Sequence, residues 1–272
     1  MRIAAAVSLL GLCSCTSLSM AEPQIHVSPY LAIYQLRGKA SVQSESAPGQ
    51  PPQDNPPQTM RTFGQDHHRE DVGVRVDIGD GFAGFRVDYY RLDMGTADTG
   101  LLGADWGRLQ SGDVVRMTAD MDELRIGYAE QLLKVETEYR EQPLVFRLAA
   151  GGVFAHRSLN LRASTDDGAR QQRVEIEGDV LYPAVRARLS WRAVALDVEY
   201  EVAPDELVLG GDWDGLQQDV EARLSYRLPQ RDVTIFGGYR YTEFPAVGDA
   251  NGFRYDADLR LDGFQLGVVL TF

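Results

Sequence analysis

The chain has little cysteine: there are 2 in 272 residues, Cys13 and Cys15, and both lie near the amino terminus. Beyond residue 15 the sequence cannot form a disulfide or a cysteine-ligated metal site. It also lacks a long hydrophobic run, because no stretch approaches the roughly 20 apolar residues that a transmembrane helix requires. Any passage of this chain through a membrane must therefore use strands.

Positive charge is scarce as well. The chain has 27 Lys and Arg against 40 Asp and Glu, which gives a formal net charge of −13. This balance argues against a nucleic-acid partner. The mean hydropathy is −0.27, which does not exclude a membrane protein, because a barrel strand needs apolar residues only at alternate positions. We find no repeat and no second composition regime, so the sequence predicts one large domain.

The amino terminus has the features of a secretory signal peptide. Arg2 precedes an apolar run over residues 3–12, and Ser19-Met20-Ala21 provides a small-x-small cleavage site. Residues 1–21 are therefore predicted to be removed, leaving one domain over residues 22–272. An alternative is that Leu12-Cys13-Ser14-Cys15 is a lipoprotein processing site at which Cys15 is acylated.

The carboxyl terminus carries the most informative pattern. Over residues 264–272 every even position is apolar, and the chain ends on the aromatic Phe272. Side chains alternate between the two faces of a strand, so these residues form one apolar stripe. The segment resembles the closing strand of a Gram-negative outer-membrane β-barrel, although a soluble edge strand could show the same stripe. The resemblance implies that Phe272 is the signal for the barrel-assembly machinery and that the surroundings are outer-membrane lipid and lipopolysaccharide.

Alternation recurs along the chain between clusters of turn-forming residues, and it predicts an all-β, single antiparallel transmembrane barrel. The parity of the apolar stripe changes at Pro183 and again at Asp262-Gly263. A bulge explains the first change, and either a bulge or a hairpin turn explains the second. The segment 134–143 is either a turn with extended strand ends or a short surface helix. With a bulge at Asp262-Gly263 the count is ten strands, and the alternatives are eight or twelve.

The predicted connections sort by length when the mature amino terminus is placed inside. Short connections at 79–81, 190–193 and 228–232 fall on one side together with the segment 134–143. The long connections fall on the other side, at 43–70, 93–116, 163–172, 203–216 and 245–252. Outer-membrane barrels have this asymmetry, with short periplasmic turns and both termini in the periplasm.

The face opposite the apolar stripe is rich in charge, which predicts a lumen filled by ion pairs between neighbouring strands. Arg147 and the acidic residues Glu175, Glu177 and Asp179 also fall on that face. The predicted lumen residues are Arg75, Asp77, Arg86, Asp88, Glu123, Arg125, Arg186, Arg188, Asp197, Glu199, Glu201, Asp219, Glu221, Arg223, Arg227 and Arg240.

Catalytic patterns are weak. His156 and Ser158 lie two residues apart, hence on one strand face, and resemble the His-x-Ser element of outer-membrane lipid A deacylases; Leu159 stands where that family has Asn. The omptin-like proteases share the predicted strand number and use acid and histidine pairs at the outer rim. Here the corresponding candidates are the residues Asp66, His67, His68, Asp212, Asp214, Asp256 and Asp258. The turn 212–215 offers oxygen ligands for a divalent cation, but an acidic turn is the simpler interpretation.

The sequence therefore predicts no metal site, cofactor or nucleic-acid partner, and it does not specify an oligomeric state. The first hypothesis is an outer-membrane barrel with a structural or surface-interaction role and a charge-filled lumen. A narrow pore for small solutes or ions is the second, and a lipid or peptide hydrolase at the outer rim is the third.

Overall fold

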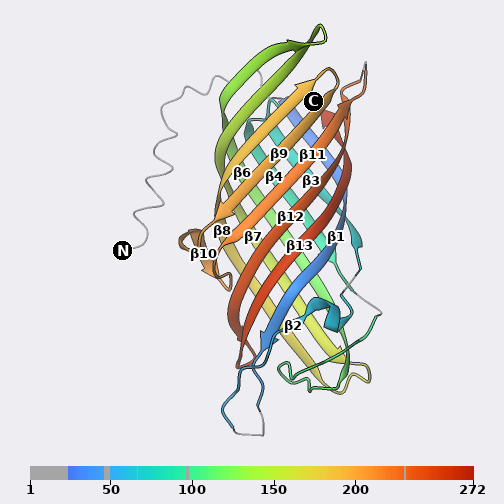
Figure 1. Ribbon diagram of the computed structural model, residues 1–272, viewed down its shortest axis with the longest axis vertical. Coiled ribbons are helices and arrows are strands. Elements are labelled where there is room, and N and C mark those ends of the chain that lie inside the picture. Colours follow the sequence, from blue (N-terminus) through green and yellow to red (C-terminus); the bar gives the residue numbers. More distant parts are fainter. Residues whose placement is uncertain (1–23, 46–49, 66, 96–97, 230) are drawn as a thin grey trace.

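The computed structural model describes residues 24–45, 50–65, 67–95, 98–229 and 231–272, so the predicted signal peptide and Cys15 lie outside the described residues. Ten long strands form one closed antiparallel ring (Figure 1). In ring order they are β8 (Gln171–Trp191), β7 (Gln142–Thr165), β6 (Val114–Tyr139), β4 (Gly84–Asp93), β3 (Arg69–Gly79), β1 (Gln24–Val42), β13 (Phe253–Thr271), β12 (Val233–Ala250), β11 (Gln217–Arg227) and β9 (Val194–Ala203), which pairs back onto β8.

The predicted all-β barrel of ten strands is therefore confirmed. Within the described residues, no helix is long and apolar enough to cross a membrane. Short elements decorate the loops, and each of the short strands pairs with a long one. These elements are β2 (Gln58–Thr59), β5 (Gly100–Leu101), β10 (Val208–Gly211) and the 3-10 helices η1 (Met60–Phe63) and η2 (Asp205–Leu207).

The two ends of the barrel differ. The end that carries the carboxyl terminus, here called the terminal end, has tight connections at 80–83, 140–141, 192–193 and 228–232. The opposite end, here called the loop end, carries β2 and η1 (Figure 1). The segment 134–143 is a turn between extended strands, with Arg140 and Glu141 at φ of 52° and 59°. The predicted long loops 163–172 and 245–252 are wrong, because the flanking strands continue into them and leave only residues 166–170 and 251–252 as connections.

The strands are longer than a membrane requires. β6 has 26 residues and β7 has 24, whereas about 9–11 tilted residues span a bilayer. Much of the barrel wall must therefore lie in water.

The pattern of burial along β13 shows where the surroundings of the wall change. Phe264 and Leu266 face outward and are exposed, at 55% and 53%. Closer to the loop end, Leu259 and Leu261 face inward and are buried, while Arg260 lies on the outer wall. The register to β1 and β12 is continuous through Asp262-Gly263, so the predicted bulge or hairpin there is wrong.

The strand β8 has the same inversion. Val174 and Ile176 face the interior, whereas Val185 and Leu189 face outward. Its register to β7 runs without a break through Pro183, so the bulge predicted at Pro183 is also wrong. The backbone keeps its regular pleat along the whole strand. The apolar residues change from the outer face to the inner face because the outer wall meets lipid at one level and water at the next.

The barrel thus has two parts, which we call the lipid-facing half and the loop half. The lipid-facing half has an apolar outer wall and a polar lumen. The loop half has a charged outer wall and an apolar interior that loop residues complete. Phe63 packs on Trp106 at 4.9 Å between ring centroids, and Trp213 packs on Phe244 at 5.6 Å.

Candidate functional site

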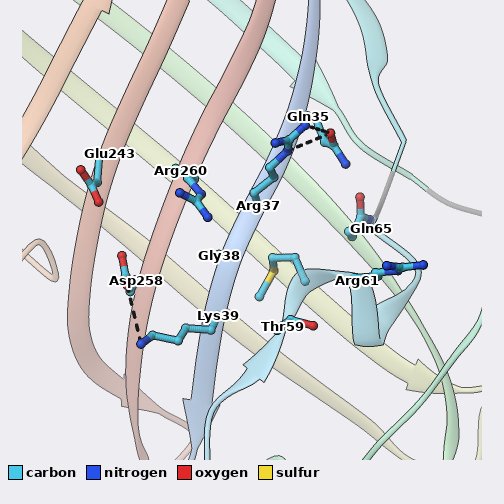
Figure 2. A pocket seen from close by; sticks show the side chains of 11 residues that line it. Gln35, Arg37, Gly38, Lys39, Thr59, Arg61, Gln65, Glu243, Asp258 and Arg260 are labelled. Atoms are coloured by element: carbon cyan, nitrogen blue, oxygen red, sulfur yellow. Dashed lines mark hydrogen bonds and ion pairs between the residues drawn. The ribbon is translucent and has the colours of Figure 1, made fainter.

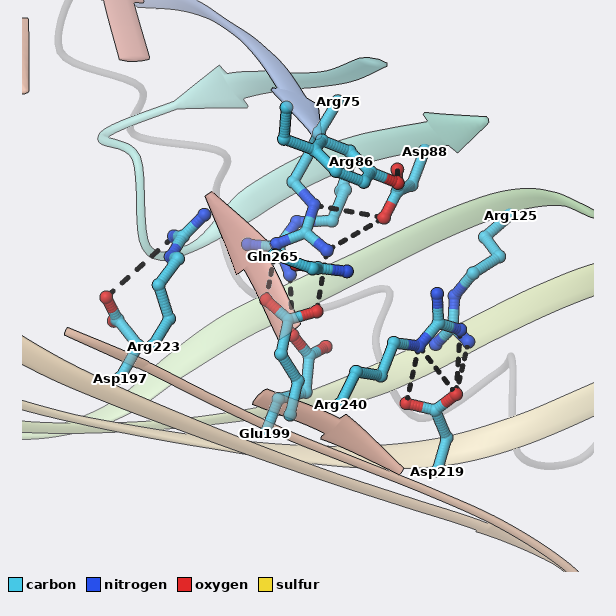
Figure 3. Close-up of polar contacts among 12 residues, drawn as sticks. Arg75, Arg86, Asp88, Arg125, Asp197, Glu199, Asp219, Arg223, Arg240 and Gln265 are labelled. Carbon is cyan, nitrogen blue, oxygen red and sulfur yellow. Dashed lines mark hydrogen bonds and ion pairs between the residues drawn. The ribbon is translucent and has the colours of Figure 1, made fainter. Parts of the chain in front are cut away.

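Polar side chains gather in two places. One is a cleft on the outer wall beside β1 and η1 (Figure 2). The other is the lumen of the lipid-facing half, where arginines and carboxylates from several strands converge (Figure 3). The strand alternation that puts apolar residues against lipid puts these charged residues inside.

The lumen contains eight arginines and eight carboxylates that pair with one another, here called the charge layer. Formal charge within this set therefore balances. Its members are Arg75, Arg86, Arg125, Arg157, Arg186, Arg188, Arg223 and Arg240 with Asp77, Asp88, Glu123, Asp197, Glu199, Glu201, Asp219 and Glu221.

Several of these pairs cross the lumen. Arg75 on β3 donates to Asp88 on neighbouring β4 at 2.8 Å and to Glu221 on β11 at 2.7 Å. β3 and β11 are four places apart in the ring of ten. Arg75 therefore ties two distant walls together as well as two adjacent strands.

Arg240 on β12 makes the widest connection. It donates to Asp219 on β11 at 2.7 Å and to Glu123 on β6 at 3.0 Å, and β6 lies five places away, on the opposite wall. Arg157 on β7 donates to the same Glu123 at 2.6 Å. Such charge-assisted bonds are stronger than neutral ones. The layer is thus cross-linked over the full width of the lumen.

Neutral side chains complete the layer. The hydroxyl of Tyr30 donates to Asp88 at 2.9 Å, and that of Thr242 donates to Asp219 at 2.7 Å. The bond from Tyr30 gives the Oδ1 atom of Asp88 a partner, and the bond from Thr242 adds to those that Arg240 and Arg125 make with Asp219.

Little space remains inside the layer. Two internal cavities lined by its members have volumes of about 10 Å³ and 20 Å³. A water molecule needs roughly 10–15 Å³ by this kind of measure, so each cavity has room for about one water. Neither cavity has room for an organic solute.

Fifteen of the sixteen predicted lumen residues belong to the charge layer. The prediction for Arg227 is wrong: it lies at the terminal end, exposed, 3.4 Å from Asp232. Glu175, Glu177 and Asp179 lie on the outer wall, because the apolar residues of β8 take the inward positions in that part. Sequence reasoning missed Arg157, although it shares the parity of Arg147.

His156 and Ser158 lie on the outer wall of β7, in register with Asp179 and Glu177 of β8. The Nδ1 atom of His156 is 2.8 Å from an oxygen of Asp179, and its Nε2 atom is 3.7 Å from Glu177. In the described part of the chain, no hydrogen bond joins Ser158 to His156. The pattern therefore provides an oriented histidine without an activated hydroxyl.

The omptin-like candidates do not form one site. His67 pairs with Asp98 at 3.0 Å in the loops, whereas Asp256 and Asp258 lie on the outer wall of β13. Asp212 accepts a hydrogen bond from the backbone of Glu177 at 3.3 Å, and Asp66 lies outside the described residues. Over the described ranges, no group of three or more His, Cys, Asp or Glu residues is arranged to hold a metal ion.

No protein-family model and no curated protein matches this chain. Similar solved structures include Ail, the attachment invasion locus protein of Yersinia pestis, at 10% identity over 92% of this chain and 99% of that one, with a TM-score of 0.36. A FadL homologue of Pseudomonas aeruginosa has 9% identity over 93% and 90%, with a TM-score of 0.32. The toluene transporter TodX of Pseudomonas putida has 9% identity over 91% and 89%, with a TM-score of 0.26.

These similarities are too low to carry a functional argument. The class of the protein follows from its own architecture instead. A closed antiparallel ring with an even number of strands, an apolar outer belt and a polar lumen defines an outer-membrane β-barrel.

Proposed function

We propose that the protein is a closed outer-membrane barrel that conducts no solute and acts through its outer surface, with a structural or interaction role. The charge layer is the observation that carries this proposal. Its pairs join opposite walls, as in the bond from Arg240 to Glu123, and its internal cavities hold about one water each. Opening a path would leave buried charges without partners, which is costly.

The loop half supports the same conclusion. Its interior is an apolar core that includes Phe63 and Trp106 from the loops and Leu259 and Leu261 from β13. Polar solutes that enter from the loop end would first have to cross this core. A narrow pore for small solutes or ions is therefore the weaker hypothesis.

The proposed orientation places the terminal end in the periplasm and the loop end outside the cell. Tight turns such as 140–141 and 192–193 occur at the terminal end, and outer-membrane barrels keep their short turns on the periplasmic side. Both ends of the mature chain are then periplasmic.

Liposome swelling tests the closed lumen. Vesicles that contain the purified full-length protein are diluted into sugars and amino acids of increasing size, with an open porin as the positive control. We expect swelling at the rate of protein-free vesicles. Size-dependent swelling at the same protein density would support the pore and overturn the closed barrel.

The second candidate function is hydrolysis of a lipid ester at the outer wall. It is favoured by the bond between His156 and Asp179, which would orient the imidazole as a general base. In this arrangement the hydroxyl of Ser158 is not hydrogen-bonded to Nε2, and the reaction would need that bond to form. Nε2 would then take the proton as Ser158 attacks the ester carbonyl and would return it to the leaving alcohol. Mass spectrometry of outer-membrane lipids tests this function: a cleaved product that disappears in both His156→Ala and Ser158→Ala would establish it, and identical lipids in all three strains would exclude it.

A further inference from the structure

The cleft on the outer wall has a volume of about 770 Å³ and lies between the barrel and the segment that contains β2 and η1 (Figure 2). β1, β12 and β13 contribute the barrel side, and Thr59, Met60 and Arg61 contribute the other side. The charged lining residues are Arg37, Lys39, Arg61, Arg260, Glu243 and Asp258.

The lining is basic in a strongly acidic protein. Four cations face two carboxylates there, although the whole chain has a net charge of −13. Lys39 lies 3.9 Å from Asp258, and Arg37 lies 3.3 Å from Asp262 at the edge of the cleft. Arg260 has no carboxylate within ion-pair distance in the described parts of the chain. The guanidinium of Arg260 is therefore available to an anion from outside the protein.

Arg37 and Arg260 are directly opposite each other in the register of β1 and β13, and both face outward. Like charges at directly opposed positions of a sheet are destabilising. Glu243 is opposite Arg260 on the other neighbouring strand, so it offsets part of this repulsion. An anion between the two guanidinium groups would remove the rest.

The cleft also lies at the boundary of the apolar belt. On β13, Phe264 and Leu266 face outward among the exposed apolar residues, and Asp262 and Arg260 follow on the same face toward the loop end. Residues at this level meet lipid headgroups when the apolar residues below them meet lipid chains.

We propose that this cleft binds the phosphate group of an outer-leaflet lipid, whose acyl chains lie along the apolar wall of β12 and β13. The proposal rests on the orientation given under the proposed function. Arginine suits this ligand because its planar fork donates two parallel hydrogen bonds to phosphate oxygens. Arg260 supplies such a fork. The Nε and Nη2 atoms of Arg37 donate to Gln35 at 2.9 Å and 2.7 Å (Figure 2), so Arg37 contributes its charge and its remaining N–H groups, and Lys39 adds charge beside them.

The test uses the purified full-length protein in lipid-free detergent. Lipopolysaccharide and the same lipid after removal of its phosphates are titrated separately, and native mass spectrometry counts the bound lipid. The variants are Arg37→Gln/Arg260→Gln and, as a control, Arg91→Gln, which removes an exposed arginine from the outer wall of β4. We expect the double variant to bind phosphorylated lipid about tenfold more weakly, and the control to bind like wild type.

Dephosphorylated lipid should bind wild type and the double variant equally weakly. Equal binding of phosphorylated and dephosphorylated lipid by wild type would overturn the proposal, as would wild-type affinity in the double variant. Inorganic phosphate is a separate arm, and saturation by phosphate at the lipid's own concentration would show that the cleft takes a free anion rather than a lipid.

A second measurement separates lipid binding from general damage. Because the opposed arginines repel each other, Arg260→Gln should melt at the same or a higher temperature than wild type in lipid-free detergent, while its stabilisation by added lipid should be smaller. Destabilisation without lipid, with a normal lipid effect, would contradict the proposal. Liposome swelling is independent of the cleft, so failure of the closed-barrel proposal would be recognised separately.

Discussion

Arg240 on β12 and Glu123 on β6 lie on opposite walls of the barrel and are joined by a hydrogen bond of 3.0 Å. The same carboxylate accepts a bond of 2.6 Å from Arg157 on β7. One glutamate therefore connects three strands, two of them neighbours and one across the lumen. The charge layer is both the closure of the lumen and a brace between its walls.

Glu123→Gln should destabilise the barrel by about 3 kcal/mol, because it leaves the buried Arg157 and Arg240 with one carboxylate fewer between them. The measurement is the free energy of unfolding by urea in lipid vesicles. Glu175→Gln is the matched control: Glu175 lies on the outer wall and pairs with Arg173, with both side chains about half exposed. A control that is as destabilising as Glu123→Gln would contradict the bracing role.

Single cysteines along β13 should reveal the inversion of its outer face. Cysteine at 254 or 256 should react with a membrane-impermeant maleimide in intact membranes, because these positions lie on the outer wall beyond the cleft and face water. Cysteine at 264, 266 or 268 should react only after detergent is added, because these positions face lipid. The two native cysteines lie in the predicted leader, so the background should be low; uniform labelling at all five positions would contradict the proposed boundary.

Asp80 should make stability depend on pH at the terminal end. Burial of this carboxyl is outweighed by hydrogen bonds from the backbone of Ala83 and Phe82, both 2.9 Å, and from Arg147, so its pKa is lowered in the folded protein. A carboxyl with a lowered folded-state pKa stabilises the fold above its ordinary pKa, near 4, and this contribution disappears as pH falls through the folded-state value.

Asp80→Asn should therefore unfold at lower urea than wild type at pH 7, and the two midpoints should converge as pH falls below about 4. A constant difference between the midpoints at every pH would show that the charge of Asp80 is not the cause.

Phe272→Ala should lower the fraction of folded, heat-modifiable protein in outer membranes without lowering the stability of the molecules that do fold. The backbone of Phe272 bonds to Ile25 at 2.9 Å and 3.3 Å, and the substitution preserves these bonds. Its side chain is exposed and adds little packing. Normal assembly of the variant would mean that Phe272 is not the signal read by the assembly machinery.

The sequence predicts the barrel well because alternation survives wherever a strand faces lipid. Leu196, Val198 and Tyr200 alternate with the charged residues Asp197, Glu199 and Glu201, and the structure places the apolar residues outside and the charges inside. The same rule fails in the loop half, where Val174 and Leu259 are inside. There the outer wall meets water. Alternation shows which positions are apolar, but it does not show whether those positions face the lumen or the outside.

The partners within the charge layer are beyond prediction from the sequence. Strand order predicts neighbouring pairs such as Arg188 with Asp197, which lie 2.5 Å apart. Bonds across the lumen, such as that from Arg75 to Glu221, depend on the shift in register that accumulates from strand to strand around the closed ring. This shift decides which residues of opposite walls lie at the same height in the barrel. Arg157 was predictable in principle, since its odd position places it on the inner face of β7.

Conductance in planar lipid bilayers tests the closed lumen most directly. Wild-type protein is inserted in potassium chloride solution, and its insertion is verified by recovery from the membrane. If the charge layer closes the lumen, the current should remain at the level of the protein-free bilayer. A steady open-channel current in wild type, with Arg223→Ala changing only its ion selectivity, would contradict the closed barrel and establish a pore.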